Sequence, residues 1–212
     1  MTETRPGLRA LKKAQTRENI SHQATRLFLE RGFDKVTIAD VAAAAQVAKM
    51  TVTNYFPRKE DLALDLHEAF VASLAATVRG RAAGESALAA LRRAFLASAA
   101  AHDPVIGFSG EPFARMITES PALVARLREF HEEREGALAA ALAEETGAGP
   151  HDVLPRLAAA QLGGAHRVLF NETVRRTLDG QGNEEIAAAL AEDGAAAFDL
   201  LEPALGGYAV RA

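Results

Sequence analysis

The fold is decided by the segment TIADVAAAAQVAKMTVTNYFPRKEDL, residues 37–62. Thr37 and Asp40 have the spacing of a capping box, in which a Thr side chain caps a helix and an acidic side chain three residues later bonds back. A second short helix is predicted over about residues 48–55, and Pro57 ends it because proline disfavours the α conformation at the residue before it. Two short helices joined by a tight turn predict a helix-turn-helix arrangement.

The second of these helices has a polar face that is suited to DNA. A helix of about two turns fits the major groove, which is roughly 12 Å wide, while its neighbour rests on the DNA backbone. Asn can pair with adenine, Thr and Tyr can donate to phosphate, and Lys can neutralise it. The apolar side chains of the same stretch are expected to point inward. The polar set comprises Lys49, Thr51, Thr53, Asn54 and Tyr55.

The composition predicts an all-α protein. Ala accounts for 47 of the 212 residues, whereas the chain has two Tyr and no Trp. Ala is the strongest helix former, and aromatic and β-branched residues favour strands. We therefore expect about nine helices, preceded by a flexible basic tail at residues 1–10. Besides the two short helices, they are predicted at about 11–31, 59–80, 85–101, 113–117, 120–145, 152–178 and 184–201.

In the segment quoted above and the helix before it, the sequence resembles the tetracycline-repressor-like (TetR) family of regulators. The resemblance covers about residues 15–65, and includes Ala24-x-x-Leu27-Phe28 and Gly32-Phe33 before the segment quoted above. It implies a DNA-binding domain at residues 1–58 and an effector-binding and dimerisation domain at 59–212. Carried over by position, the family's DNA contacts fall on Thr37, Lys49, Met50, Thr51, Thr53, Asn54, Tyr55 and Lys59.

Three positions depart from the family pattern. Gln46 stands in the turn where the family usually has Gly, Ala48 stands where it often has Ser, and Thr53 where it commonly has Tyr. These departures bear on affinity and operator sequence more than on the fold. They keep open the alternative of a helical ligand carrier or adaptor whose first domain does not bind DNA.

The basic residues near the N-terminus allow two interpretations. Residues 1–65 hold 11 Lys and Arg against 8 Asp and Glu, whereas the rest of the chain holds 13 against 20. A basic N-terminal part followed by an acidic C-terminal part indicates that the N-terminal part has an anionic partner. The first cations of the chain form either a tail without a role or an arm over the DNA. They are Arg5, Arg9, Lys12, Lys13 and Arg17.

The resemblance also implies a homodimer and a small-molecule effector. Dimerisation would use the last two helices, through residues for which packing inside one chain is the alternative interpretation: Leu157, Ala160, Gly164, Ala165, Val168, Ile186, Leu190, Ala197 and Leu201. An apolar pocket that is poor in aromatic residues, in an acidic body, favours a lipophilic or cationic effector. Candidate effector contacts, each of which could instead be ordinary core, are Phe95, Phe108, Phe113, Met116, Phe130, His166, Phe170 and Asn171.

The residues that catalysis or metal binding requires do not come together in the sequence. The chain has no Cys, and its six His follow no metal-ligand spacing. Neither a phosphate-binding Gly-rich loop nor a G-x-S-x-G motif is present. No apolar stretch reaches the length of a membrane span. We expect a cytoplasmic transcriptional regulator that binds double-stranded DNA, without enzymatic activity, cofactor or metal. It is predicted to be a repressor, and an activator of the same fold is the alternative.

Overall fold

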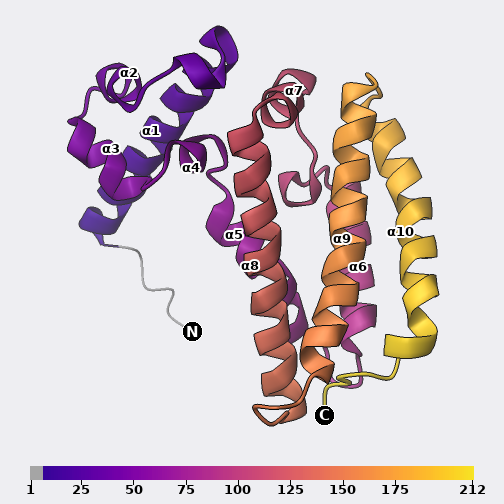
Figure 1. Cartoon of the computed structure of the whole chain (residues 1–212). Helices are drawn as coiled ribbons and strands as arrows, with labels where there is room; N and C mark the ends of the chain where they lie inside the picture. The colour runs from indigo at the N-terminus through magenta and orange to yellow at the C-terminus, as the bar shows by residue number, and fades with distance from the viewer. Residues whose placement is uncertain (1–6) are drawn as a thin grey trace. The chain divides into compact units, whose positions relative to one another are not determined.

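The computed structural model describes residues 7–212, and in this range every regular element is a helix (Figure 1). There are ten α-helices and two short 3-10 helices, so the all-α prediction is confirmed with one helix more than expected. The chain divides into two compact units. We call Met1–Asp65 with Met116–Arg126 the head, and Leu66–Arg115 with Leu127–Ala212 the body. The head thus extends past the expected domain boundary between residues 58 and 59.

The head is built from short helices around a longer one. The short elements and the long first helix bury their apolar side chains in one common core. The elements are α1 (Leu8–Arg31), η1 (Phe33–Lys35), α2 (Ile38–Ala44), α3 (Lys49–Tyr55) and α4 (Lys59–Ala63), joined by the start of α8. Their core includes Ile20, Phe28, Val41, Val52, Phe56, Leu62 and Leu123, all of which are buried.

Two predicted boundaries in the head are wrong. The first helix begins at Leu8, so residues 8–10 are helical and do not belong to a tail; residues 1–6, with Arg5, lie outside the described part of the chain. The helix predicted over 59–80 is two helices, because the backbone leaves the α conformation at Leu64 (φ −106°, ψ 54°). Hydrogen bonds hold this break: the Arg17 guanidinium donates to the Asp65 carbonyl oxygen at 2.8 Å, and the Ser21 hydroxyl donates to the Asp65 carboxylate.

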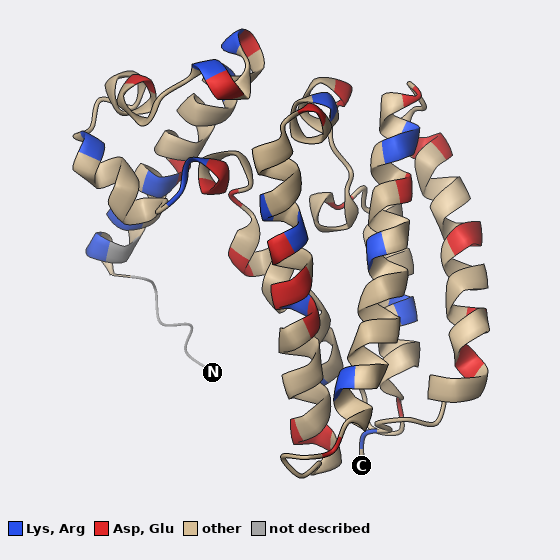
Figure 2. Cartoon of the chain, viewed as in Figure 1, with Lys and Arg blue, Asp and Glu red and all other residues tan. Residues whose placement is uncertain are grey.

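The body is built mainly from long helices. They are α5 (His67–Arg79), α6 (Ala87–Ala100), η2 (Pro104–Ile106), α7 (Glu111–Glu119, whose end belongs to the head), α8 (Pro121–Thr146), α9 (Leu154–Leu178) and α10 (Asn183–Leu205). Helix α10 packs along α6 and α9 (Figure 1). The core of the body includes Leu91, Phe95, Leu162, Leu190 and Phe198. Acidic residues mark α10, which contains no Lys or Arg (Figure 2).

One cation is completely buried at the end of the body where the chain terminates. The side chain of Arg81 is not exposed at all, and it forms an ion pair with Glu145 at 2.9 Å. Its guanidinium also donates to the carbonyl oxygens of Val78, Glu85 and Ala209. The charge is therefore compensated and its N–H groups are satisfied, which is the condition under which a buried Arg is tolerated.

None of the helices between residues 7 and 212 combines the length and the apolar character that crossing a bilayer requires.

Candidate nucleic-acid interface

Helix α2 begins at the predicted capping box. The Thr37 hydroxyl accepts from the Asp40 amide at 3.2 Å, and the Asp40 carboxylate accepts from the Thr37 amide at 2.8 Å and from its hydroxyl at 2.6 Å. The bond from the Thr37 hydroxyl, followed by that from its amide, holds the pKa of the Asp40 carboxyl below its ordinary value. The cap is confirmed, and it fixes where the first short helix begins. The contact of Thr37 with phosphate stays a prediction.

The turn between α2 and α3 is made at Gln46, as the sequence predicts. Gln46 has φ 56°, in the left-handed region, which costs a residue other than Gly about 1–2 kcal/mol. Backbone bonds close the turn, from the Gln46 amide to the Ala43 carbonyl and from the Val47 amide to the Ala42 carbonyl. The side-chain amide of Asn19 on α1 donates to the Ala45 carbonyl at 3.1 Å. The turn forms without the Gly that the family usually has.

Helix α3 separates an apolar inner face from a polar outer face. Val52 is fully buried on the inner side, and Phe56, which follows the helix, is buried beside it. On the outer side Met50 is 70% exposed. The other predicted contacts on this helix are exposed or half-buried: Lys49, Thr51, Thr53, Asn54 and Tyr55. Six of the eight predicted DNA-binding residues thus lie on one two-turn helix: Lys49, Met50 and Asn54 are exposed, whereas Tyr55 packs partly against the core of the head.

Two of the predicted contacts are engaged within the head. The Thr53 hydroxyl donates to the Met50 carbonyl at 3.1 Å, inside its own helix. The Lys59 ammonium donates to the Phe33 carbonyl at 2.5 Å and lies 4.2 Å from the centre of the Phe33 ring. Partial burial lowers the pKa of Lys59, with Asp34 and Glu60 opposing the shift. Their roles on DNA stay predictions, and for Lys59 the structure adds a role in joining α4 to η1.

Three residues that hold the interface in place were not predicted. Asn19 supports the turn, and Arg126 on α8 forms an ion pair with Asp61 on α4 at 2.8 Å, with both side chains nearly buried. Each of these contacts joins residues far apart in the sequence. A polar residue on an amphipathic helix gives no sign in the sequence of which distant residue it will bond. These contacts could therefore not have been inferred from the sequence.

The predicted effector residues do not form one group. Asn171 is exposed, Phe113 is half-buried, and Met116 packs against the core of the head. The remaining five are buried in the body: Phe95, Phe108, Phe130, His166 and Phe170. His166 lies 5.7 Å from Phe95, and Phe170 lies 5.2 Å from His131, measured between ring centres.

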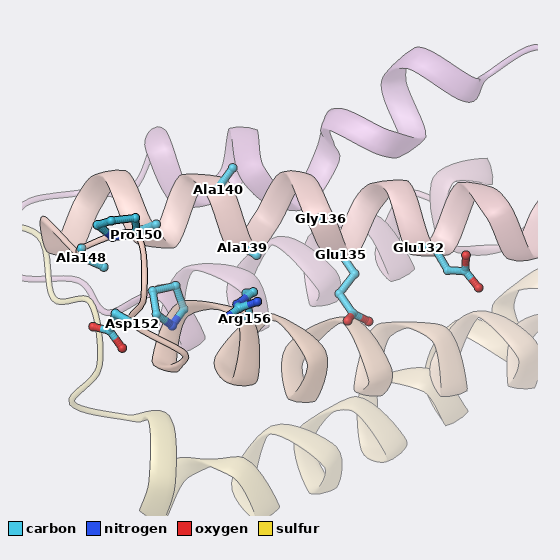
Figure 3. A pocket seen from close by; sticks show the side chains of 12 residues that line it. Glu132, Glu135, Gly136, Ala139, Ala140, Ala148, Pro150, Asp152 and Arg156 are labelled. Carbon is cyan, nitrogen blue, oxygen red and sulfur yellow. The ribbon is translucent and has the colours of Figure 1, made fainter.

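An open groove occurs elsewhere in the body, between α8 and the beginning of α9 (Figure 3). Its volume is about 540 Å³, and none of the predicted effector residues lines it. The side chains of Glu132, Glu135 and Arg156 border it, together with small residues such as Gly136 and Ala139. Four of its twelve lining residues are alanine, and four carry charged side chains: Glu132, Glu135, Asp152 and Arg156. Within residues 7–212 no cluster of three or more His, Asp or Glu side chains is arranged to hold a metal ion.

Comparison with known families and proteins gives matches over both parts of the chain. The family described as "Bacterial regulatory proteins, tetR family" matches residues 20–66. A second family, described as "MftR C-terminal domain", matches residues 85–206. The HTH-type transcriptional regulator TcmR of Streptomyces glaucescens is 31% identical over 177 residues, which cover 81% of this chain and 78% of TcmR.

Solved structures show the same fold. A putative TetR-family transcriptional regulator from Syntrophomonas wolfei has a TM-score of 0.56 at 17% identity, covering 88% of this chain and 96% of that one. NalD, the secondary repressor of the MexAB-OprM multidrug efflux pump in Pseudomonas aeruginosa, has a TM-score of 0.55 at 20% identity, covering 87% and 97%.

Proposed function

Because the chain belongs to the TetR family and is a DNA-binding transcriptional regulator, we propose that it is a repressor which binds a palindromic operator as a homodimer. A small molecule that binds the body releases it from the DNA. The protein acts in the cytoplasm, and its response is a change in DNA affinity, without catalysis.

The observation that carries this proposal is the two-faced α3. Its buried Val52 anchors the helix on the head, while Lys49, Met50 and Asn54 stand exposed on the other side. A short helix fixed on one side and polar on the other is what entry into the major groove requires. In this role Asn54 reads a base edge, whereas Lys49 and Tyr55 hold the backbone.

The contacts next to α3 position the helix on the duplex. Thr37 at the start of α2 and Thr51 on α3 contact phosphates, and Thr53 lies beside them with a hydroxyl already bonded to its own helix. Contacts to phosphate fix register and orientation without reading sequence. Lys59 contributes a further cation at the beginning of α4, provided that it leaves the Phe33 carbonyl.

The homodimer forms through α9 and α10. Ile186 and Leu190, which the sequence suggested for this interface, are fully buried inside the chain's own core. The large apolar side chains left exposed are Leu154, Leu157 and Val168 on α9 and Leu200 on α10, the last being 80% exposed. Helix α9 has four Arg and one Glu, whereas α10 has six acidic residues, so α9 of one copy attracts α10 of its partner.

Release follows if the effector favours a dimer in which the two α3 helices no longer match the half-site spacing. A ligand can shift such an equilibrium only by its difference in affinity for the two states. The body supplies a reason for that difference, because it buries polar groups which a ligand would satisfy.

The test is selection of duplexes from a random pool by the full-length protein, followed by binding titrations of the enriched sequence by fluorescence anisotropy. We expect an inverted repeat whose half-sites are centred about one helical turn, or 34–36 Å, apart or a multiple of it. Affinity should fall steeply with salt, because phosphate contacts release counterions.

A protein in which Asn54 and Lys49 are both replaced by Ala is the comparison, and it should show no enrichment. A variant with Glu30→Ala and Arg26→Ala on the exposed face of α1 controls for two surface changes in the head, since these side chains pair with each other at 3.0 Å. Enrichment of an asymmetric site, or no sequence enrichment with the unaltered chain, would contradict the proposal.

A further inference from the structure

Arg134 on α8 is a buried cation without a hydrogen-bonded or ion-paired partner among the described residues. Arg134 is 3% exposed, and its Nε atom is buried with no hydrogen-bond acceptor among the described residues. No described carboxylate forms an ion pair with its guanidinium. The guanidinium carbon lies 4.5 Å from the centre of the Phe70 ring. Burial lowers the pKa of Arg134 to about 10, and Asp103 opposes this only in part.

The comparison with Arg81 shows that this is a property of the site and not of arginine in this fold. Arg81 is equally buried in the same body, yet it has a carboxylate at 2.9 Å and three carbonyl acceptors. A buried charge costs several kcal/mol unless it is paired and hydrogen-bonded. Arg81 is paired and hydrogen-bonded by groups of its own chain. Arg134 is not, so a bound ligand would have to supply the anion and the acceptors.

Two histidines beside Arg134 share this condition. His166 on α9 is 4% exposed, and neither ring nitrogen has a hydrogen-bond partner between residues 7 and 212. His131, three residues before Arg134 on the same face of α8, has an unpaired Nε2. Burial, then the charge of Arg134, lowers the pKa of His166; burial lowers that of His131 to about 4, with Arg134 and Arg167 adding to the effect. Both rings are neutral at pH 7, so each can donate one N–H.

Aromatic rings surround these three side chains. Phe70 and Phe170 lie 5.0 and 5.2 Å from the His131 ring, and Phe95 and Phe198 lie 5.7 and 5.6 Å from the His166 ring. The rings come from α5, α6, α9 and α10, so the polar group is enclosed on several sides by apolar surface. We call Arg134, His131 and His166 the polar triplet.

We propose that the polar triplet receives the carboxylate of an organic acid whose remaining part is apolar, and that this acid is the effector. The inference rests on the proposed function, because it names the chemistry of the molecule that the body senses. One guanidinium balances one negative charge in a bidentate pair, and the two neutral imidazoles complete the hydrogen bonds of the carboxylate. A phosphate monoester brings more charge than one cation compensates. The sequence had favoured a lipophilic or cationic effector; an unpaired buried cation repels a cationic ligand and leaves the lipophilic part of that expectation.

The experiment uses the full-length protein and isothermal titration calorimetry. The probes are the straight-chain carboxylates from hexanoate to dodecanoate and 3-phenylpropanoate, each paired with its primary alcohol. We expect the best carboxylate to bind about 10- to 100-fold more tightly than its alcohol, which is the range for a charge-assisted hydrogen bond. The same carboxylate should release the selected duplex, and its alcohol should not.

The decisive variant is Arg134→Met, which keeps the length of the side chain and removes the charge. It should lose the preference for the carboxylate while its thermal midpoint stays equal or rises, because an unpaired buried charge is replaced by an apolar group. Arg134→Lys keeps the charge without the planar fork and should retain only part of the preference. Arg128→Met, on an exposed position of the same helix, removes the same charge and should change nothing.

Four outcomes would overturn the inference: no carboxylate binds, the alcohols bind as tightly, Arg134→Met keeps the preference, or Arg134→Met fails to fold while Arg134→Lys binds both probes equally.

DNA binding without any probe is measured beside these titrations. If the protein selects no duplex but prefers the carboxylate, the proposed function fails and the ligand site stands. If it binds its duplex and is released by a neutral molecule alone, the ligand site fails and the proposed function stands.

Discussion

In the head the buried polar side chains are bonded, whereas in the body several are not. Ser21 and Ser120 are the buried polar residues of the described head; the hydroxyl of the first donates to Asp65 and that of the second accepts from the Leu123 amide. In the body the polar triplet leaves four buried nitrogen atoms without a partner. Among the described residues, only the body thus leaves fully buried polar side-chain atoms unsatisfied.

This difference has an energetic meaning. A buried donor without an acceptor costs about 1–3 kcal/mol, which is a large fraction of the stability of an ordinary domain. Such a cost is typical of binding sites, where stability is exchanged for function. The head performs its task with an outer surface and can have a satisfied core, while the body has to admit a molecule and therefore keeps polar groups unsatisfied.

The largest effect should come from removing a core side chain of the head. Phe56 is 1% exposed and supports the Arg17 guanidinium, which lies 4.9 Å from its ring centre. Phe56→Ala should lower the free energy of unfolding by about 3–5 kcal/mol and abolish DNA binding, because α3 loses its anchor. Denaturant unfolding, monitored by circular dichroism, measures the free energy of unfolding. Anisotropy titration measures DNA binding.

The matched control for this change is Leu29→Ala, since Leu29 lies on α1 and is half-exposed. Its cost should stay below about 1 kcal/mol, as for most surface positions. Carboxylate binding by the body of Phe56→Ala should persist. If carboxylate binding were lost together with DNA binding, the head and the body would not be independent in stability.

The pH dependence of stability comes next. His131 stays neutral in the folded chain down to a pKa of about 4, whereas it takes up a proton near 6.5 when unfolded. The unfolded state therefore binds more protons between these values, and this contribution to stability, complete above pH 6.5, is lost as the pH falls toward 4. The loss should reach about 2–3 kcal/mol, and the neighbouring charges that face the ring, Arg134 and Arg167, act in the same direction.

His131→Gln cannot titrate, so unfolding curves at pH 7 and pH 4.5 should differ less for this variant than for the unaltered chain. His22→Gln serves as control because His22 is exposed on α1 of the head. Equal acid sensitivity of the unaltered chain and His131→Gln would mean that the ring is not kept neutral by the body.

A smaller effect is expected at the outer surface of the head. Asn54→Ala should lower affinity for the selected duplex by about 1–3 kcal/mol and relax the preference at one base pair, because the side-chain amide no longer pairs with a base edge. Binding to random duplex should change little. Asn171→Ala makes the same chemical change at an exposed position of α9 and should leave both affinities unaltered. Equal losses of Asn54→Ala on both duplexes would show that Asn54 reads no base.

The sequence predicted the head well because its signals are local. The capping box at Thr37, the turn at Gln46 and the end of α3 at Phe56 each depend on residues within a few positions. The break at Leu64 could not be predicted, since 62–67 contains no Gly or Pro and the helix ends through contacts of Asp65 with α1.

The polar triplet could not be predicted for a related reason. Arg134 lies in the run Arg128-Glu129-Phe130-His131-Glu132-Glu133-Arg134, which has the composition of a solvated helix face. Phe70 of α5 lies against Arg134, and Phe170 of α9 lies against His131, so both contacts come from distant parts of the sequence. The sequence placed His166 and Phe170 among residues that either contact an effector or form ordinary core. It gave no information on which polar atoms lack partners.

The smallest effect tests Lys59, for which sequence and structure give different roles. If its ammonium leaves the Phe33 carbonyl to contact a phosphate, Lys59→Ala should reduce the slope of log affinity against log salt by about 1 per subunit. Its affinity should fall by the same factor on selected and random duplex. Lys35→Ala, an exposed cation of η1, is the control for loss of one charge in the head. An unchanged slope with a lower thermal midpoint would assign Lys59 to the head's own structure, and the satisfied core of the head would then include this cation.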